Sequence, residues 1–176
     1  RRIGHVAARL VPAMVLLYMF CGLFILLGNI TKLDNILLLI IQDAFTGHAV
    51  AGGTLGSVMI TGIRRAAFSN EAGIGTESMA HGAAITKEPV REGLVAMLGP
   101  MIDTLVVCSI TGFAILATGV WRDTDLNGIS MTSAAFKTGI PFLGETILLI
   151  IVSIFSVTTI IGYSYYGSKC TAFLFG

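Results

Sequence analysis

The length of its apolar blocks most constrains what this chain can fold into. Residues 10–30, LVPAMVLLYMFCGLFILLGNI, contain no charged side chain. A helix of about 20 apolar residues crosses the roughly 30 Å hydrocarbon core of a bilayer. Residues 94–120 and 142–163 form comparable blocks, although the first of these carries Asp103. We therefore predict an all-α integral membrane protein that spans the lipid bilayer.

A further apolar block, residues 35–63, is interrupted by glycine and is predicted to be a broken helix. Four glycines and three hydroxyl residues occupy residues 46–57. Glycine frees the backbone from helical dihedrals, which leaves amides and carbonyls for a ligand. Small residues also let helices pack closely in membranes, so both interpretations stay open. A break near residues 47–57 suggests these residues for binding a substrate: Gly52, Gly53, Thr54, Gly56 and Ser57.

The basic residues orient the four predicted spans. With the first residues in the cytoplasm, eight of the eleven Lys and Arg side chains lie on the cytoplasmic side, in accordance with the positive-inside rule. Residues 64–93 then form a cytoplasmic connector, and residues 121–141 an extracytoplasmic loop that ends in a short helix. We expect a multi-pass protein of the plasma (inner) membrane, with spans at about residues 10–30, 35–63, 94–120 and 142–163.

The composition excludes several classes of protein. Only 12% of the residues are charged, about half the share in a soluble domain, and no basic run is long enough to indicate a nucleic-acid partner. The first residue is not Met, and we expect an internal fragment of a larger protein. We predict no resident cofactor. The cysteines lack the spacing of a metal or redox pair and are expected to be small buried apolar residues: Cys21, Cys108 and Cys170.

Asp103 is the charged side chain within the predicted third span. A carboxylate is costly in contact with lipid, so an interior partner or a cavity is expected around it. An ion pair with Arg64, Arg65 or Arg91 is one solution.

Two further sets of polar residues stand in or beside the predicted spans. Ser69 and Asn70 precede Glu71 in the connector, a pattern that is typical of a cap at the start of a short helix. The last span carries hydroxyl side chains, which in membrane helices usually bond to a carbonyl one turn earlier: Ser153, Ser156, Thr158 and Thr159.

The stretch GIRRAAFSNEAGIGT, residues 62–76, resembles the signature of the alanine or glycine:cation symporter family, the sodium:alanine symporters. RRIGHVAARLVPAMVLLY, VREGLVAMLGPMIDTLVVC and FSVTTIIGYSYYG resemble this family too. The likeness covers nearly the whole chain and is weakest in residues 121–139. The family is similar to the leucine transporter, which has ten core helices in two inverted repeats. The resemblance implies that this chain holds core helices five to eight, that the sixth is broken, and that the remaining helices of the full-length transporter are its partners.

The resemblance also implies a function and a set of binding residues. The function is sodium-coupled symport of a small neutral amino acid, alanine or glycine, by alternating access, with sodium as the co-transported ion. Unwound backbone in the broken helix would bind the amino-acid zwitterion; Thr54 stands where the family often has an aromatic residue, which leaves side-chain selectivity open. The Phe155 carbonyl with the Thr158 and Thr159 hydroxyls would form part of a sodium site. A gating or structural role near the cytoplasmic face is expected for Arg64, Arg65, Ser69, Asn70, Glu71 and Asp103.

Two other functions are compatible with particular residues. Proton coupling with Asp103 as the carrier is an alternative to sodium coupling, and replacing sodium while a pH gradient is held separates the two. A membrane-embedded enzyme would pair His48 or His81 with Asp103 or Glu71. The predicted topology brings no such set together, so we expect a protein that is not an enzyme.

Overall fold

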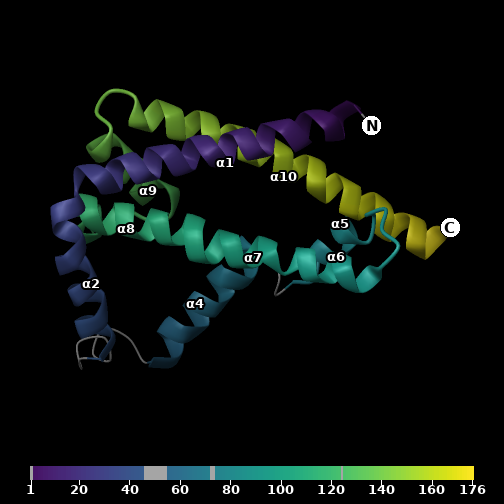
Figure 1. The fold of residues 1–176 in the computed structure, drawn as a ribbon, viewed down its shortest axis with the longest axis horizontal. Coiled ribbons are helices and arrows are strands. Elements are labelled where there is room, and N and C mark those ends of the chain that lie inside the picture. Colours follow the sequence, from purple (N-terminus) through teal and green to yellow (C-terminus); the bar gives the residue numbers. More distant parts are fainter. Residues whose placement is uncertain (1, 46–54, 72–73, 124) are drawn as a thin grey trace. The chain divides into compact units, whose positions relative to one another are not determined.

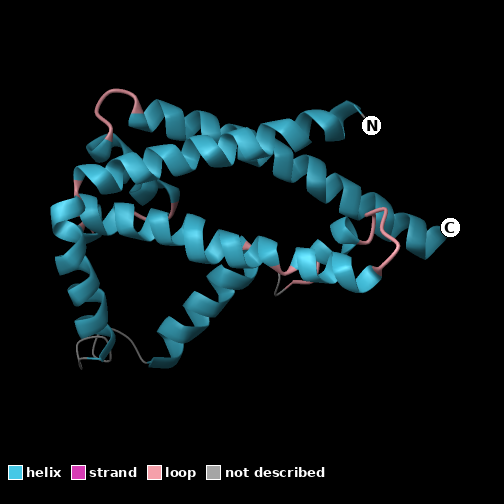
Figure 2. Cartoon of the chain, viewed as in Figure 1, coloured by secondary structure: helices cyan, strands magenta, loops and turns pink. Residues whose placement is uncertain are grey.

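Residues 2–45, 55–71, 74–123 and 125–176 are described by the computed structural model, and the regular elements in these ranges are helices (Figures 1 and 2). The predicted all-α class is therefore confirmed for this part of the chain. The chain divides into two compact units, residues 1–36 with 109–165 and residues 37–108 with 166–176. Each unit is described by itself.

Three helical stretches of the described residues are long and apolar enough to cross a membrane: Arg9–Gly28, Pro89–Thr118 and Gly144–Phe175. Their mean hydropathies are 2.6, 1.9 and 2.2. They bury little of their surface within the chain, as expected of helices that face lipid or further helices.

The first unit is built around a set of mutually packed helices. In it α1 contacts both α8 and α9, and α8 contacts α9, an arrangement that is visible in Figure 1. A short 3₁₀ helix, η2 (Val120–Arg122), follows α8. The helices of this unit are α1 (Arg2–Gly28), the beginning of α2 (Ile30–Phe45), α8 (Ser109–Thr118), α9 (Ile129–Gly139) and most of α10 (Gly144–Phe175).

Helix α9 supplies the centre of the first unit's core. Phe136 and Ile25 are each 1% exposed, and the Phe136 ring stacks on Tyr18 with ring centroids 5.4 Å apart. The Tyr18 hydroxyl shares a hydrogen bond with the Thr111 hydroxyl of α8, so the polar end of the ring has a partner. The predicted short helix near the end of residues 121–141 is thus confirmed, and it is a core element as well as a loop helix.

Close backbone approach explains a glycine at the start of α10. A Cβ atom on Gly144 would lie 2.1 Å from the Phe136 carbonyl oxygen and 3.1 Å from the Ile140 Cβ. No other residue type fits there without a shift of the backbone. This contact fixes how the loop after α9 returns into α10.

The second unit contains α4 and the helical stretch that begins at Pro89. The end of α4 contacts this stretch. Pro89 occupies the first turn of α6, where its missing N–H costs no hydrogen bond. Pro100 has no N–H to donate to the carbonyl of Ala96, four residues earlier, and α6 ends at Ala96. The elements are α4 (Leu55–Ser69), α5 (Glu77–His81), α6 (Pro89–Ala96), α7 (Leu98–Ile102) and a π-helical segment, η1 (Asp103–Cys108), which continues into α8.

The predicted broken span corresponds to two short helices. The described parts are α2, of 16 residues, and α4, of 15 residues, and each alone is shorter than the roughly 20 residues that cross a bilayer. Residues 46–54 between them lie outside the described residues, and so does most of the predicted break near residues 47–57.

Candidate functional site

The signature stretch ends one helix and does not begin another. Ser69 is the last residue of α4, and the Asn70 amide donates to the carbonyl of Ala66 at 3.5 Å. The expectation that Ser69 and Asn70 cap a new helix at Glu71 is therefore wrong. The next helix, α5, begins at Glu77.

Glu71 organises the turn that follows α4. Its φ of +58° is in the left-handed region, which is uncommon for a residue with a side chain. Its carbonyl accepts hydrogen bonds from the amides of Ile74 and Gly75 at 3.0 and 3.1 Å. Its carboxylate accepts a bond from the Thr76 hydroxyl at 2.7 Å. The acidic residue of the signature thus holds a turn through both its backbone and its side chain.

The side chains of Ser69 and Asn70 reach the π-helical segment. Ser69 Oγ donates to Asp103 Oδ2 at 3.2 Å, and Asn70 Nδ2 donates to Thr104 Oγ1 at 3.1 Å. Cys108 Sγ lies 3.9 Å from Asp103 Oδ2 and 3.8 Å from Ser69 Oγ. We call these five residues, Ser69, Asn70, Asp103, Thr104 and Cys108, the polar cluster.

The π-helix explains how the polar cluster forms. Bonding between residues five apart places such residues one above the other, and Asp103 and Cys108 are five apart. In a regular α-helix, at 100° per residue, their side chains would point in different directions. Single π-helical turns inside α-helices are rare and are frequent at functional sites. Nothing in the amino-acid composition marks a change of helical register, so the sequence does not predict that Thr104 and Cys108 belong to the polar cluster.

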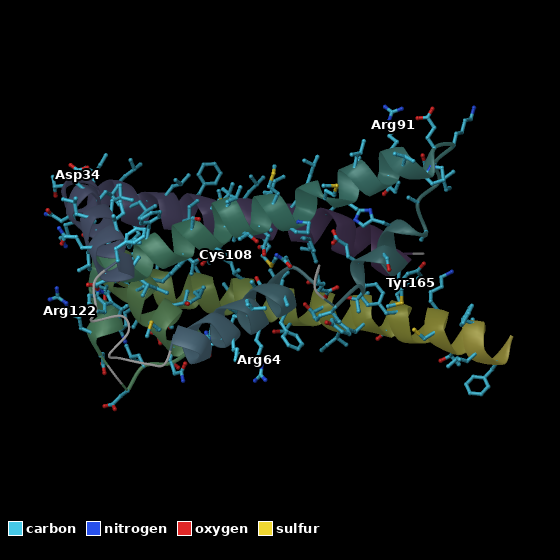
Figure 3. The ribbon with its side chains drawn as sticks, turned by 90° about the horizontal axis from the view of Figure 1, so that it is seen from below. Asp34, Arg64, Arg91, Cys108, Arg122 and Tyr165 are labelled. Carbon is cyan, nitrogen blue, oxygen red and sulfur yellow. The ribbon has the colours of Figure 1, made fainter. Side chains whose placement is uncertain are left out.

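Among the described residues, the partners of Asp103 are hydrogen-bond donors and not cations. The predicted ion pair with Arg64, Arg65 or Arg91 is not formed: the ion pairs found in the described residues do not include Asp103. Figure 3 shows the Arg64 and Arg91 guanidinium groups pointing outward, away from Cys108. Arg65 lies four residues, about 6 Å along α4, before Ser69, and it is Ser69 that contacts the carboxylate.

His81 belongs to a separate cluster that joins α5 to α6. Its Nδ1 lies 2.7 Å from Glu92 Oε1, and its Nε2 lies 3.6 Å from Glu77 Oε1. Glu71 and Asp103 have the other partners given above, so within the described residues His81 pairs with neither of them. His48 lies outside the described residues.

The hydroxyl residues of α10 bond mainly to their own helix, as expected. The Thr158 hydroxyl donates to the carbonyls of Ile154 at 3.0 Å and Phe155 at 2.9 Å. Two of the predicted sodium ligands, the Thr158 hydroxyl and the Phe155 carbonyl, are therefore in direct contact. Thr159 is half-buried, and its hydroxyl has no hydrogen bond within the described residues. The same bond to a carbonyl four residues earlier is made by Ser153, Ser156 and Ser164.

Most of the predicted substrate-binding residues lie outside the described residues. Gly52, Gly53 and Thr54 are not among the described residues. Gly56 and Ser57 lie in the first turn of α4, which begins at Leu55. Their roles stay predictions.

The three cysteines differ in solvent exposure. Cys21 is buried, whereas Cys108 and Cys170 are exposed. Cys108 belongs to the polar cluster, and Cys170 Sγ lies 3.7 Å from the Met79 sulfur. The expectation of three buried apolar cysteines is therefore wrong for two of them.

The fold and these polar groups define a helical membrane protein that holds a carboxylate and hydroxyls on helices of membrane-spanning length. Such groups are typical of proteins that carry ions or small polar molecules. Comparison with known proteins makes the assignment specific, because residues 1–176 match the sodium:alanine symporter family. The chain belongs to this family.

Three relatives are similar over nearly the whole chain. An uncharacterized transporter of Haemophilus influenzae is 40% identical over 100% of this chain. A probable sodium/glutamine symporter of Bacillus subtilis is 36% identical over 99% of it, and a sodium/alanine symporter of Methanococcus maripaludis is 38% identical over 100%. The chain spans 40%, 36% and 39% of the length of these relatives, respectively.

Proposed function

We propose that the full-length protein to which this chain contributes carries a small neutral amino acid, alanine or glycine, across the plasma membrane together with sodium. The observation that carries this proposal is the family match over all 176 residues. The sodium/alanine and sodium/glutamine symporters among its relatives support both the class of substrate and the ion. No bond is made or broken in this reaction, so an enzyme's catalytic residues are not needed.

The proposed architecture has four spans, with α2 and α4 as the two halves of a broken helix. The chain would supply core helices five to eight of a leucine-transporter-like bundle, and the rest of the transporter would supply the others. Backbone freed at the break, near Gly52, Gly53 and Thr54, would bind the amino and carboxylate groups of the substrate. Half-helix ends provide amides for a carboxylate and carbonyls for a cation.

The proposed sodium site uses the carbonyl of Phe155 and the hydroxyls of Thr158 and Thr159. Sodium, like other hard cations, prefers oxygen ligands. The 2.9 Å contact between Thr158 Oγ1 and the Phe155 carbonyl supports the site, because it brings two oxygen ligands together on one turn of α10. Sodium and substrate would then be coupled because both favour the same loaded conformation.

The test is sodium-dependent alanine uptake by the full-length protein with Thr158→Ala and Thr159→Ala combined. We expect sodium-dependent uptake to be lost, because two of the proposed ligands are removed. Ser164→Ala is the matched control, since its hydroxyl makes the same bond one turn back, to Ile160 at 2.7 Å, and lies outside the site. Unchanged sodium dependence in the double variant would refute the assignment of the site.

A further inference from the structure

Asp103 lies where an unpaired negative charge is unfavourable. It stands in the middle of the helical stretch Pro89–Thr118, whose mean hydropathy is 1.9. It is nine residues beyond Leu94, where the predicted span begins, which corresponds to about 14 Å along the helix. A bare carboxylate at such a depth is costly and needs a compensating positive charge.

The described part of the chain supplies hydrogen bonds for this carboxylate but no charge. Ser69 Oγ donates to Asp103 Oδ2 at 3.2 Å, and the Cys108 thiol donates to the same oxygen at 3.9 Å. Both donors are neutral, so neither balances the charge of the carboxylate. Arg64 and Arg91 are exposed and point away (Figure 3).

The atoms around Asp103 suit a small, hard, singly charged cation. Where α4 meets η1, the Ser69 hydroxyl contacts Asp103 Oδ2, and the neighbouring residues Asn70 and Thr104 contact each other through Nδ2 and Oγ1. Oxygen atoms are the ligands that hard cations prefer. No group of three His, Cys, Asp or Glu side chains in the described residues is arranged to hold a metal ion, so the cluster does not resemble a transition-metal site. One carboxylate balances one monovalent cation.

We propose that the polar cluster binds a co-transported monovalent cation, sodium or a proton, with the Asp103 carboxylate as the charged ligand and Ser69 beside it. This proposal rests on the proposed function and deepens it, because it adds a second coupling site to the one on α10. It also gives the family signature a role: the Ser-Asn pair at the end of α4 completes a site on the neighbouring π-helix. Ser69 and Asn70 contact Asp103 and Thr104, which lie near the middle of the helical stretch Pro89–Thr118.

The first variant for the test is Asp103→Asn, which removes the charge and keeps a side chain of the same shape. Purified full-length transporter is reconstituted in vesicles, and the limiting alanine accumulation and the charge moved per alanine are measured at zero membrane potential. One arm uses a tenfold sodium gradient at constant pH, and the other uses a pH gradient of one unit with equal sodium concentrations on both sides of the membrane. Each coupled cation multiplies the limiting accumulation by its own concentration ratio, so the loss of one lowers accumulation about tenfold.

We expect Asp103→Asn to accumulate about tenfold less alanine in one arm, the arm whose gradient drives the cation of this site. The variant should also move one elementary charge fewer per alanine. The sodium arm assigns the site to sodium, and the pH arm assigns it to a proton. Alanine exchange without a gradient should persist. Normal alanine accumulation and a normal charge moved per alanine in Asp103→Asn would overturn the proposal. Asp103 would then serve to hydrogen-bond two helices, or would pair with a basic residue elsewhere in the transporter.

Ser69→Ala keeps the test decisive if Asp103→Asn is inactive in every assay. This variant retains the carboxylate and loses one ligand, so we expect the cation concentration for half-maximal transport to rise about tenfold. The matched control is Ser78→Ala, whose hydroxyl bonds locally to the Gly75 carbonyl at 2.6 Å, outside the cluster. An unchanged half-maximal concentration in Ser69→Ala refutes the site. A wild-type protein without any cation-dependent uptake instead refutes the proposed function.

Discussion

Replacing Gly144 by alanine tests the packing of α9 against the start of α10. The new Cβ would lie 2.1 Å from the Phe136 carbonyl oxygen, roughly 1.3 Å short of the 3.4 Å at which ordinary contact begins. The obstacle is backbone, which cannot move aside as the end of a side chain can. The same carbonyl accepts the hydrogen bond of the Ile140 amide at 2.8 Å, so the shift also disturbs the turn that ends α9.

The expected loss of stability in Gly144→Ala is the sum of two destabilising effects and one stabilising effect. Overpacking in a well-packed interior costs about 1–3 kcal/mol, and a weakened backbone hydrogen bond adds about 1 kcal/mol. Alanine in place of glycine favours a helix by up to about 1 kcal/mol. We therefore expect Gly144→Ala to lower the free energy of unfolding by about 1–3 kcal/mol. Gly162→Ala is the control, because Gly162 lies in the same helix and its new Cβ would meet no atom of the described residues within 4 Å outside the neighbouring helix backbone.

The assay is thermal unfolding of the purified full-length protein, followed by intrinsic fluorescence at one fixed scan rate, because membrane proteins of this size often unfold irreversibly. Gly144→Ala should unfold several degrees below the wild type, and Gly162→Ala at or slightly above it. Equal unfolding temperatures for the two variants would refute the close approach of α10 to the Phe136 carbonyl.

Two further predictions concern hydrogen bonds in the two units. Tyr18→Phe removes the bond to the Thr111 hydroxyl and keeps the aromatic stacking, so the protein should lose about 1 kcal/mol of stability in the same unfolding assay; no loss would show that this bond does not contribute. His81→Ala removes the 2.7 Å contact with Glu92, so the amides of α5 should exchange hydrogen about fivefold faster, as expected for about 1 kcal/mol. Unchanged exchange would contradict a tie between α5 and α6.

Apolar length predicted the main helices because it depends on local composition. Residues 10–30 and 142–163 are uncharged or nearly so, and a long helix forms at each. The short helix before Pro141 was also predicted from its sequence. Its burial was not, because Phe136 becomes a core residue only when α1 and α8 pack against it.

The polar cluster depends on contacts that sequence spacing does not show. Asp103 was predicted to need a partner, but charge alone suggested an arginine, and the partner is Ser69. Thr104 and Cys108 come to the same place only because the helix changes to π register at Asp103. Ser69 and Asn70 are typical of the start of a helix, but the same residue types also form hydrogen bonds between helices.

Alanine accumulation by purified full-length protein in vesicles tests the central claim most directly. With a tenfold inward sodium gradient, no pH gradient and no membrane potential, a symporter must concentrate alanine inside, by about tenfold for each coupled sodium ion. Collapse of the sodium gradient should release the accumulated alanine. Alanine that only equilibrates across the membrane, at the same level with and without the gradient, would contradict sodium-coupled symport.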